Sequence, residues 1–107
     1  FARNGWVDGQ AHQVYVGRFD RLEFRRNYVY GTVAGSAVKS RAAVNIIEYN
    51  FIADGARGSG NYSLDLTDGG QAVIVGNVIE KAKNANNSAF VSYAAEAMSW
   101  QDNGLYL

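Results

Sequence analysis

The sequence predicts an all-β fold, a parallel β-helix (β-solenoid) of about four coils in which the backbone winds round once per repeat. Three observations predict it: an internal repeat with a period in the mid-twenties, short β-branched and aromatic segments separated by Gly and Asn, and the lack of any helix-length periodic segment. The chain has 107 residues, enough for one domain with its own core. Residues 1–107 are therefore expected to form a single β-helix segment.

One series of segments aligns on an asparagine. The aligned residues are Asn27, Asn50 and Asn77, which are 23 and 27 residues apart. Hydrophobic residues recur three positions before and two positions after each of them: Phe24, Ile47, Ile74, Val29, Ile52 and Ile79. Stacked coils lie about 4.8 Å apart, so amides in one column hydrogen-bond along the stack, and asparagine tolerates the left-handed backbone of a bend. We therefore expect an asparagine ladder at a bend.

A second series falls between these segments. It aligns on an apolar residue, with spacings of 24, 26 and 27 residues, at Val14, Val38, Leu64 and Val91. Around this residue the side chains alternate, so that Val38 and Ser40 point inward and Lys39 points outward. Leucine is too sparse for a leucine-rich repeat, which leaves the β-solenoid as the architecture with this period.

Composition excludes several function classes. Ten basic and ten acidic residues cancel, so no field attracts nucleic acid or an anionic membrane, and neither is expected as a partner. The chain has no cysteine, which excludes disulfides, thiolate metal sites and cysteine nucleophiles. A single histidine, His12, argues against a conventional zinc hydrolase, and no metal site is assigned.

Several phrases carry a family resemblance: HxxYVGRxDRLEFRxN at 12–27, VKSRA at 38–42 and LDLxxGG at 64–70. Together with the residues around them, which span nearly the whole chain, they resemble bacterial right-handed parallel β-helix repeat proteins of the pectate-lyase-like superfamily. The resemblance implies a right-handed coil, a secreted or periplasmic location, and a carbohydrate-active role, since related branches cleave acidic polysaccharides by β-elimination. One departure is Ser63, where such relatives would carry an acidic residue beside Asp65.

The resemblance also bears on the chain ends and on cofactors. Phe1 and the segment GLYL at 104–107 both start within a repeat, so the chain is expected to be an interior fragment or a truncated member with uncapped ends that self-associates as a homo-oligomer. Calcium is the cation such lyases commonly bind, and Asp65, Asp68 and Glu96 offer oxygen ligands without a recognised loop signature. No other cofactor is expected.

Residues one period apart become surface neighbours in a coil stack. The outward column of the first strand is Tyr15, Lys39, Asp65 and Ser92, with Arg41 two residues after Lys39, His12 at the strand's entry and Tyr93 flanking. β-Elimination at a uronate needs its carboxylate neutralised, a base at C5 and an acid for the leaving oxygen. Arg41 is the expected carboxylate partner, Lys39 or His12 the base and Tyr15 the acid, so these four are the candidate catalytic residues. Asp65, Ser92 and Tyr93 are the candidate substrate-binding residues.

Two alternative interpretations stay open. Lys39 and Asp65 would simply form a salt bridge across coils on a solvated face, and His12 would make a structural hydrogen bond within its turn, near Asp8. The whole chain would then be a non-catalytic structural β-solenoid that associates end to end.

Overall fold

The computed structural model of the chain describes residues 12–56 and 58–107. Within these residues the chain forms strands and turns and no helix, so the prediction of an all-β fold is confirmed for this part. The strands are β1 (Val14–Val16), β2 (Arg21–Arg25), β3 (Tyr28–Tyr30), β4 (Val38–Ser40), β5 (Val44–Glu48), β6 (Phe51–Ala53), β7 (Leu64–Leu66), β8 (Gln71–Val75), β9 (Val78–Glu80), β10 (Val91–Tyr93) and β11 (Gly104–Tyr106).

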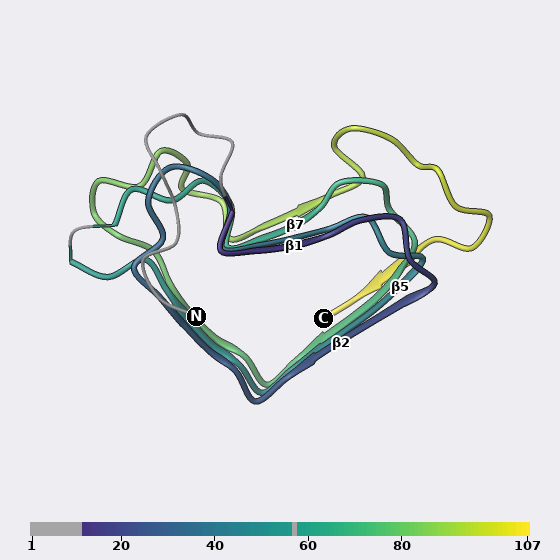
Figure 1. The fold of residues 1–107 in the computed structure, drawn as a ribbon, viewed down its shortest axis with the longest axis horizontal. Helices are drawn as coiled ribbons and strands as arrows, with labels where there is room; N and C mark the ends of the chain where they lie inside the picture. The colour runs from purple at the N-terminus through teal and green to yellow at the C-terminus, as the bar shows by residue number, and fades with distance from the viewer. Residues whose placement is uncertain (1–11, 57) are drawn as a thin grey trace.

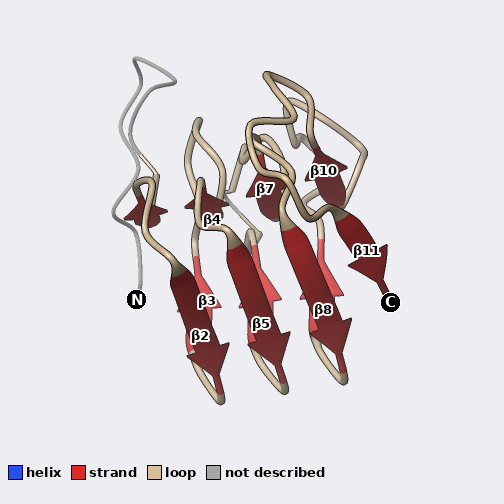
Figure 2. Cartoon of the chain, turned by 90° about the vertical axis from the view of Figure 1, so that its right-hand side faces the viewer, coloured by secondary structure: helices blue, strands red, loops and turns tan. Residues whose placement is uncertain are grey.

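The strands form three parallel sheets. The first sheet has the order β1-β4-β7-β10, the second β2-β5-β8-β11 and the third β3-β6-β9. Successive strands along the chain thus belong to successive sheets. Figure 1 looks along the stack, where β1 and β7 overlie each other on the upper side and β2 and β5 overlie each other on the lower right. Figure 2 shows β2, β5, β8 and β11 side by side. This arrangement is consistent with a parallel β-solenoid.

The strand register reproduces both repeats found in the sequence. In the first sheet Val14 pairs with Val38, Val38 with Leu64 and Leu64 with Val91. In the second sheet Phe24 pairs with Ile47, and Ile47 with Ile74. A slip of one residue would turn each inward side chain to the outside, so the repeat in the sequence fixes which residues share a face.

The asparagine ladder is present between the second and third sheets. The backbone N–H and the side-chain amide of Asn27 both donate to Oδ1 of Asn50, at 2.9 and 3.2 Å. Asn50 donates in the same way to Oδ1 of Asn77, at 2.9 Å in both bonds. Each round of the chain is therefore tied to the next through one amide column.

The bend itself lies one residue earlier than expected. The left-handed residues are Arg26 (φ 54°), Tyr49 (φ 56°) and Gly76 (φ 67°), each directly before an asparagine. The expectation that the asparagines themselves take this conformation was wrong, because they already lie at the entrance to the third sheet, where the N–H groups of Asn27 and Asn50 donate to the asparagine of the next round. Left-handed backbone at a non-glycine residue costs about 1–2 kcal/mol, so the ladder holds Arg26 and Tyr49 in a strained conformation.

The core consists of the inward side chains of all three sheets. It contains Phe24, Val29, Val38, Ile47, Ile52, Leu64, Leu66 and Ile74, none more than 8% exposed. Each such side chain contributes about 1.5–3 kcal/mol when it is removed from water. Alternation then leaves the outward residues of the short strands free to carry chemistry.

The last strands of the described stack expose apolar side chains. Val78 on β9, Phe90 before β10 and Tyr106 on β11 are 58%, 47% and 62% exposed. Residues 94–96, which follow β10, form a bend. Phe1 to Ala11 lie outside the described residues. No helix in the described part of the chain could cross a lipid bilayer.

Candidate functional site

The outer face of the first sheet carries the predicted column. Tyr15 pairs with Lys39, Lys39 with Asp65 and Asp65 with Ser92 in neighbouring strands. The middle of this face is recessed, since the side chain of Lys39 is 15% exposed and Asp65 is 6% exposed. The stack therefore brings residues from four strands to one polar, partly desolvated surface.

Lys39 and Arg41 both bind Glu96, which comes from the loop between β10 and β11. The ammonium of Lys39 lies 3.1 Å from Oε2 of Glu96, and Nη2 of Arg41 lies 3.2 Å from each Glu96 oxygen. The salt bridge expected between Lys39 and Asp65 is absent from the ion pairs of the described residues. Glu96 lies further out than Asp65 and takes its place as the counterion. These two bonds lower the pKa of Glu96, with Lys39 the larger cause.

Arg41 is also held from two other sides. Its Nη1 donates to Oδ1 of Asp68 at 2.5 Å, and its Nε donates to the hydroxyl of Tyr15 at 3.0 Å. Asp68 is 3% exposed at its side chain whereas Glu96 is 50% exposed. Breaking a buried ion pair costs about 3–5 kcal/mol, while an exposed pair contributes about 0–1 kcal/mol. Asp68 is thus a fixed partner of Arg41, and Glu96 is the one that can be displaced.

Asp65 is a buried carboxylate without an ion pair among the described residues. Its Oδ2 accepts a hydrogen bond from the hydroxyl of Ser36 at 3.4 Å, and its Oδ1 has no hydrogen-bond partner. Burial raises the pKa of Asp65, and the positive charge of Lys39 and a hydrogen bond from Ser92 only partly offset this. A buried carboxylate with one free oxygen is typical of a functional position rather than of a structural one.

His12 lies beside this column at the entry of β1. Its Nδ1 accepts the backbone N–H of Ser36 at 2.8 Å, and its ring stacks on Tyr15 with 6.1 Å between centroids. Burial lowers the pKa of His12, and Lys39 lowers it further. The structural hydrogen bond suggested by the sequence exists, but it joins His12 to the neighbouring round; Asp8 lies outside the described residues. A neutral His12 that accepts at Nδ1 carries its proton on Nε2.

The remaining candidates occupy different places. Ser92 is buried in the column and is the register partner of Asp65 in the neighbouring strand. Tyr93 packs against the core, and its hydroxyl donates to the carbonyl of Gly70 at 2.5 Å and accepts the N–H of Gly104 at 2.9 Å. The structure thus places Tyr93 on the inner side of β10, away from the other site residues.

The loop from Ala94 to Asn103 supplies the partners that sequence reasoning missed. It projects outward at the upper right of Figure 1. The N–H of Ser99 donates to the carbonyl of Asp68, and the indole N–H of Trp100 donates to the carbonyl of Arg41 at 3.2 Å. These contacts could not be predicted from the spacing of residues, because the loop belongs to neither repeat.

The carboxylates proposed as calcium ligands do not converge on an open position. The guanidinium of Arg41 lies between Asp68 and Glu96, and Asp65 is buried and accepts from the hydroxyl of Ser36. Among the residues that the structure describes, no group of three or more His, Asp or Glu could hold a metal ion. In this arrangement the side chains do not fit a calcium ion.

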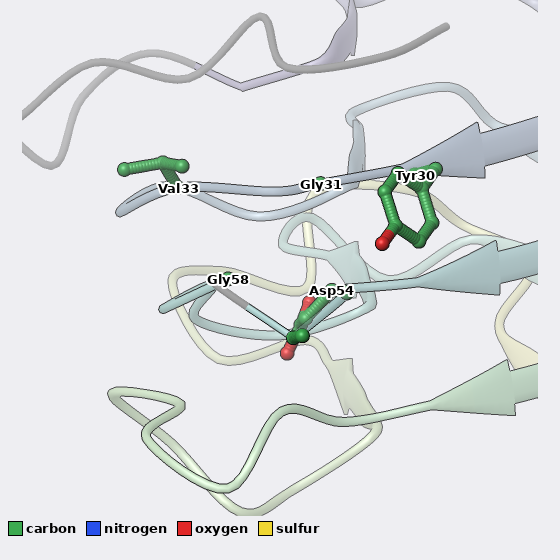
Figure 3. A pocket seen from close by; sticks show the side chains of 7 residues that line it. Tyr30, Gly31, Val33, Asp54 and Gly58 are labelled. Atoms are coloured by element: carbon green, nitrogen blue, oxygen red, sulfur yellow. The ribbon is translucent and has the colours of Figure 1, made fainter.

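A pocket of about 360 Å³ lies at another corner, among the turns that follow β3 and β6. Figure 3 shows Tyr30, Val33 and Asp54 around it. The Asp54 carboxylate is buried and lies 3.3 Å from the ammonium of Lys81, which also donates to two backbone carbonyls. This pair satisfies its own charges and joins neighbouring turns, and the pocket shares no residue with the column.

No family model, curated protein or solved structure matches the chain. The chemistry of the face must therefore be judged from its own groups. It offers two cations that hold a carboxylate, a buried carboxylate with a free oxygen, and a phenol and an imidazole that can donate protons.

Proposed function

We propose that this chain is a carbohydrate-active segment of a right-handed parallel β-helix of about four coils, similar to the pectate-lyase-like superfamily. On this proposal it binds, and cleaves, an acidic polysaccharide on the face that carries Lys39, Arg41 and Asp65. Three parallel sheets and the phrases at 12–27, 38–42 and 64–70 support the assignment. Such a substrate lies outside the cytoplasm, so the proposal includes a secreted or periplasmic location.

One observation carries the proposal: Lys39 and Arg41 already bind a carboxylate, that of Glu96. A uronate presents the same group, and a fork of guanidinium nitrogens binds it in the same manner. Because Glu96 is half-exposed and lies on a loop, its contribution is small enough for a polysaccharide carboxylate to replace it. Glu96 thus acts as an internal competitor for the site.

The proposed reaction is β-elimination. Arg41 neutralises the uronate carboxylate, a base removes the C5 proton, the C4–O bond breaks as the C4–C5 double bond forms, and the leaving oxygen takes up a proton. The substrate carboxylate displaces Glu96 and so frees Lys39. Lys39 in its unprotonated form is the base, because the unpartnered oxygen of Asp65 is buried and out of the substrate's reach. His12, with its proton on Nε2, and Tyr15 are suited to protonate the leaving oxygen. No step uses calcium.

The test is incubation with pectate, alginate and glycosaminoglycans while the absorbance of unsaturated uronates is followed. Lys39→Ala and Arg41→Ala should abolish activity, and both should lose retention in a gel that contains the polysaccharide. Arg25→Ala is the matched control, because Arg25 forms ion pairs with Glu23 and Glu48 on the second sheet, away from the site. Activity that survives both site substitutions would remove this site. Retention without cleavage would leave a binding module.

A second candidate function is structural self-association of the stack. The strands β9, β10 and β11 favour it, because each is the last of its sheet among the described residues and an unpaired parallel edge can accept another strand. Sedimentation over a range of protein concentrations tests it. A single monomeric species at every concentration would contradict it.

A further inference from the structure

The outer face of the first sheet, with Lys39, Arg41 and Asp65, is called the carboxylate-binding face below. A second pocket, of about 440 Å³, lies next to this face. It is formed where the loop before β11 folds over the starts of β5 and β8. Its polar lining consists of Arg18, Gln71, Ser99, Gln101 and Asp102, together with the indole of Trp100. Ligand pockets for small molecules have volumes of this order, and they combine an apolar surface with a few polar groups.

Two contacts hold the side chain of Trp100 in place. Its indole N–H donates to the carbonyl of Arg41, and the guanidinium of Arg18 lies 5.0 Å from the centre of its ring. A cation over an indole is attracted to the ring by about 0.5–1 kcal/mol at an exposed site. The ring is therefore held rigidly, which lowers the entropic cost of stacking a ligand on it.

The pocket is physically joined to the carboxylate-binding face through one buried residue. Asp68 accepts from Nη1 of Arg41 through Oδ1 and from Nη1 of Arg18 through Oδ2, at 2.5 and 3.2 Å. Arg41 belongs to the face, and Arg18 lines the pocket. Arg41 and Arg18 thus share one carboxylate, so a polysaccharide bound at Arg41 can extend to Arg18 and Trp100.

We propose that this pocket binds a further pyranose unit of the same acidic polysaccharide, next to the unit held by Lys39 and Arg41. The inference rests on the proposed function. The indole stacks on the apolar face of the sugar ring. Gln71, Ser99, Gln101 and Asp102 offer donors and acceptors for its hydroxyls, and Arg18, which is half-exposed, offers a cation for a second carboxylate.

Charge and composition favour a sugar over an apolar ligand. The groups that line the pocket are mostly polar and exposed, and they include both donors and acceptors. An apolar ligand would leave these groups without partners, at a cost of about 1–3 kcal/mol for each buried one. A sugar satisfies them and covers the indole at the same time.

The experiment titrates the full chain with oligogalacturonates from disaccharide to octasaccharide. In the parent protein, affinity should rise with length once the chain reaches the second pocket. Gln71→Ala leaves the Ala94–Asn103 loop intact and should reduce only this gain. Trp100→Ala should reduce it by about three- to tenfold, the usual worth of one aromatic stacking contact. Because Trp100→Ala can loosen the loop, Trp100→Phe, which keeps a ring, should restore part of the gain.

Each result then has a distinct meaning. Affinity that rises equally with length in the parent, Gln71→Ala and Trp100→Ala overturns the second subsite but not the proposed function. Binding that depends on Trp100 and Gln71 and is unchanged in Lys39→Ala and Arg41→Ala overturns the proposed function but keeps the pocket. If neither oligogalacturonates nor oligosaccharides from alginate and glycosaminoglycans bind, both are overturned. Arg25→Ala serves as the control in every titration.

Discussion

At the scale of single residues, Asp65 shows a conflict between stability and function. A buried carboxylate with an unpartnered oxygen destabilises the folded state. Nothing in the architecture requires an acid at this place, because its equivalents in the column are Tyr15, Lys39 and Ser92. A costly group at the centre of a polar recess is expected where function retains it.

Asp65→Asn should therefore make the protein more stable at neutral pH, by about 1 kcal/mol, and should lower the rate of cleavage, because it removes a negative charge beside Lys39. Since burial raises the pKa of Asp65 above its ordinary value of 3.8, the folded state loses stability as pH rises from that value through the higher folded pKa. The gain from Asp65→Asn should vanish below this range. Urea titrations at neutral and acidic pH measure it. An equal difference at both pH values would contradict burial as the cause.

Glu96 provides the second test at this scale. Glu96→Gln removes the internal competitor, so affinity for an acidic oligosaccharide should rise about two- to fivefold, the equivalent of one exposed ion pair. Glu80→Gln, at an exposed carboxylate on β9, is the control. Calorimetric titration measures both. Weaker binding in Glu96→Gln would show that Glu96 is part of the binding site instead.

The pH dependence of the Glu96 contacts has the opposite sign to that of Asp65. Lys39 and Arg41 lower the pKa of Glu96 from its ordinary value of 4.5, so its stabilising contribution is complete above that value and is lost as pH falls through the lower folded pKa. In the parent protein, acid should therefore release the Ala94–Asn103 loop. Faster amide exchange at Ser99 in acid, relative to core strands and after correction for intrinsic rates, is the expected signature.

At the scale of secondary-structure elements, the asparagine ladder fixes the bend between the second and third sheets. Asn50 is 2% exposed, accepts from two donors of Asn27 and donates to Asn77 and to the carbonyl of Phe24. Asn27 only donates to Asn50, through its backbone N–H and its side-chain amide. The contribution of each asparagine should thus follow its number of bonds.

Asn50→Ala should destabilise the protein by about 2–4 kcal/mol, and Asn27→Ala by about 1 kcal/mol, because the first leaves several buried partners unsatisfied and the second removes one side-chain bond. Urea denaturation with a common m-value measures the difference. Equal losses in the two variants would show that the column does not act as a ladder.

The sequence predicted the ladder but not its geometry. Asn27, Asn50 and Asn77 were found from spacing alone, since a periodic fold repeats its side chains. The left-handed residues before them were not found, because Arg26 and Tyr49 are not residue types that favour that conformation. Only Gly76 is of a residue type that favours left-handed backbone.

At the scale of the whole molecule, parallel stacking makes separated residues into neighbours. The column of Tyr15, Lys39, Asp65 and Ser92 followed from the period, and the register confirms it. The ion pairs to Glu96 and the position of Trp100 could not be predicted, since loops lie outside the repeat and their contacts have no period. Tyr93 was expected on the outer face beside Ser92, but inward and outward side chains alternate along a strand. Because Tyr93 follows the outward residue Ser92 directly, its side chain points inward and packs against the core.

Association belongs to this scale too. Val78→Lys on β9 places a charge beside the last described strands, where Val78 is largely exposed, so folding should be unaffected while any end-to-end association is suppressed. Sedimentation of the variant and the parent at equal concentrations measures the effect. If both sediment alike as large species, the association uses another surface.

Cysteine cross-linking tests most directly whether the stack places the site residues side by side. The chain has no cysteine of its own, so a pair introduced as Lys39→Cys and Asp65→Cys reports one distance. These positions are partners in neighbouring strands, about 4.8 Å apart, which a disulfide can bridge. Rapid oxidation of this pair, and none for Lys39→Cys with Ser92→Cys two strands away, is the predicted result. No cross-link in the first pair, or equal cross-linking in both, would contradict it.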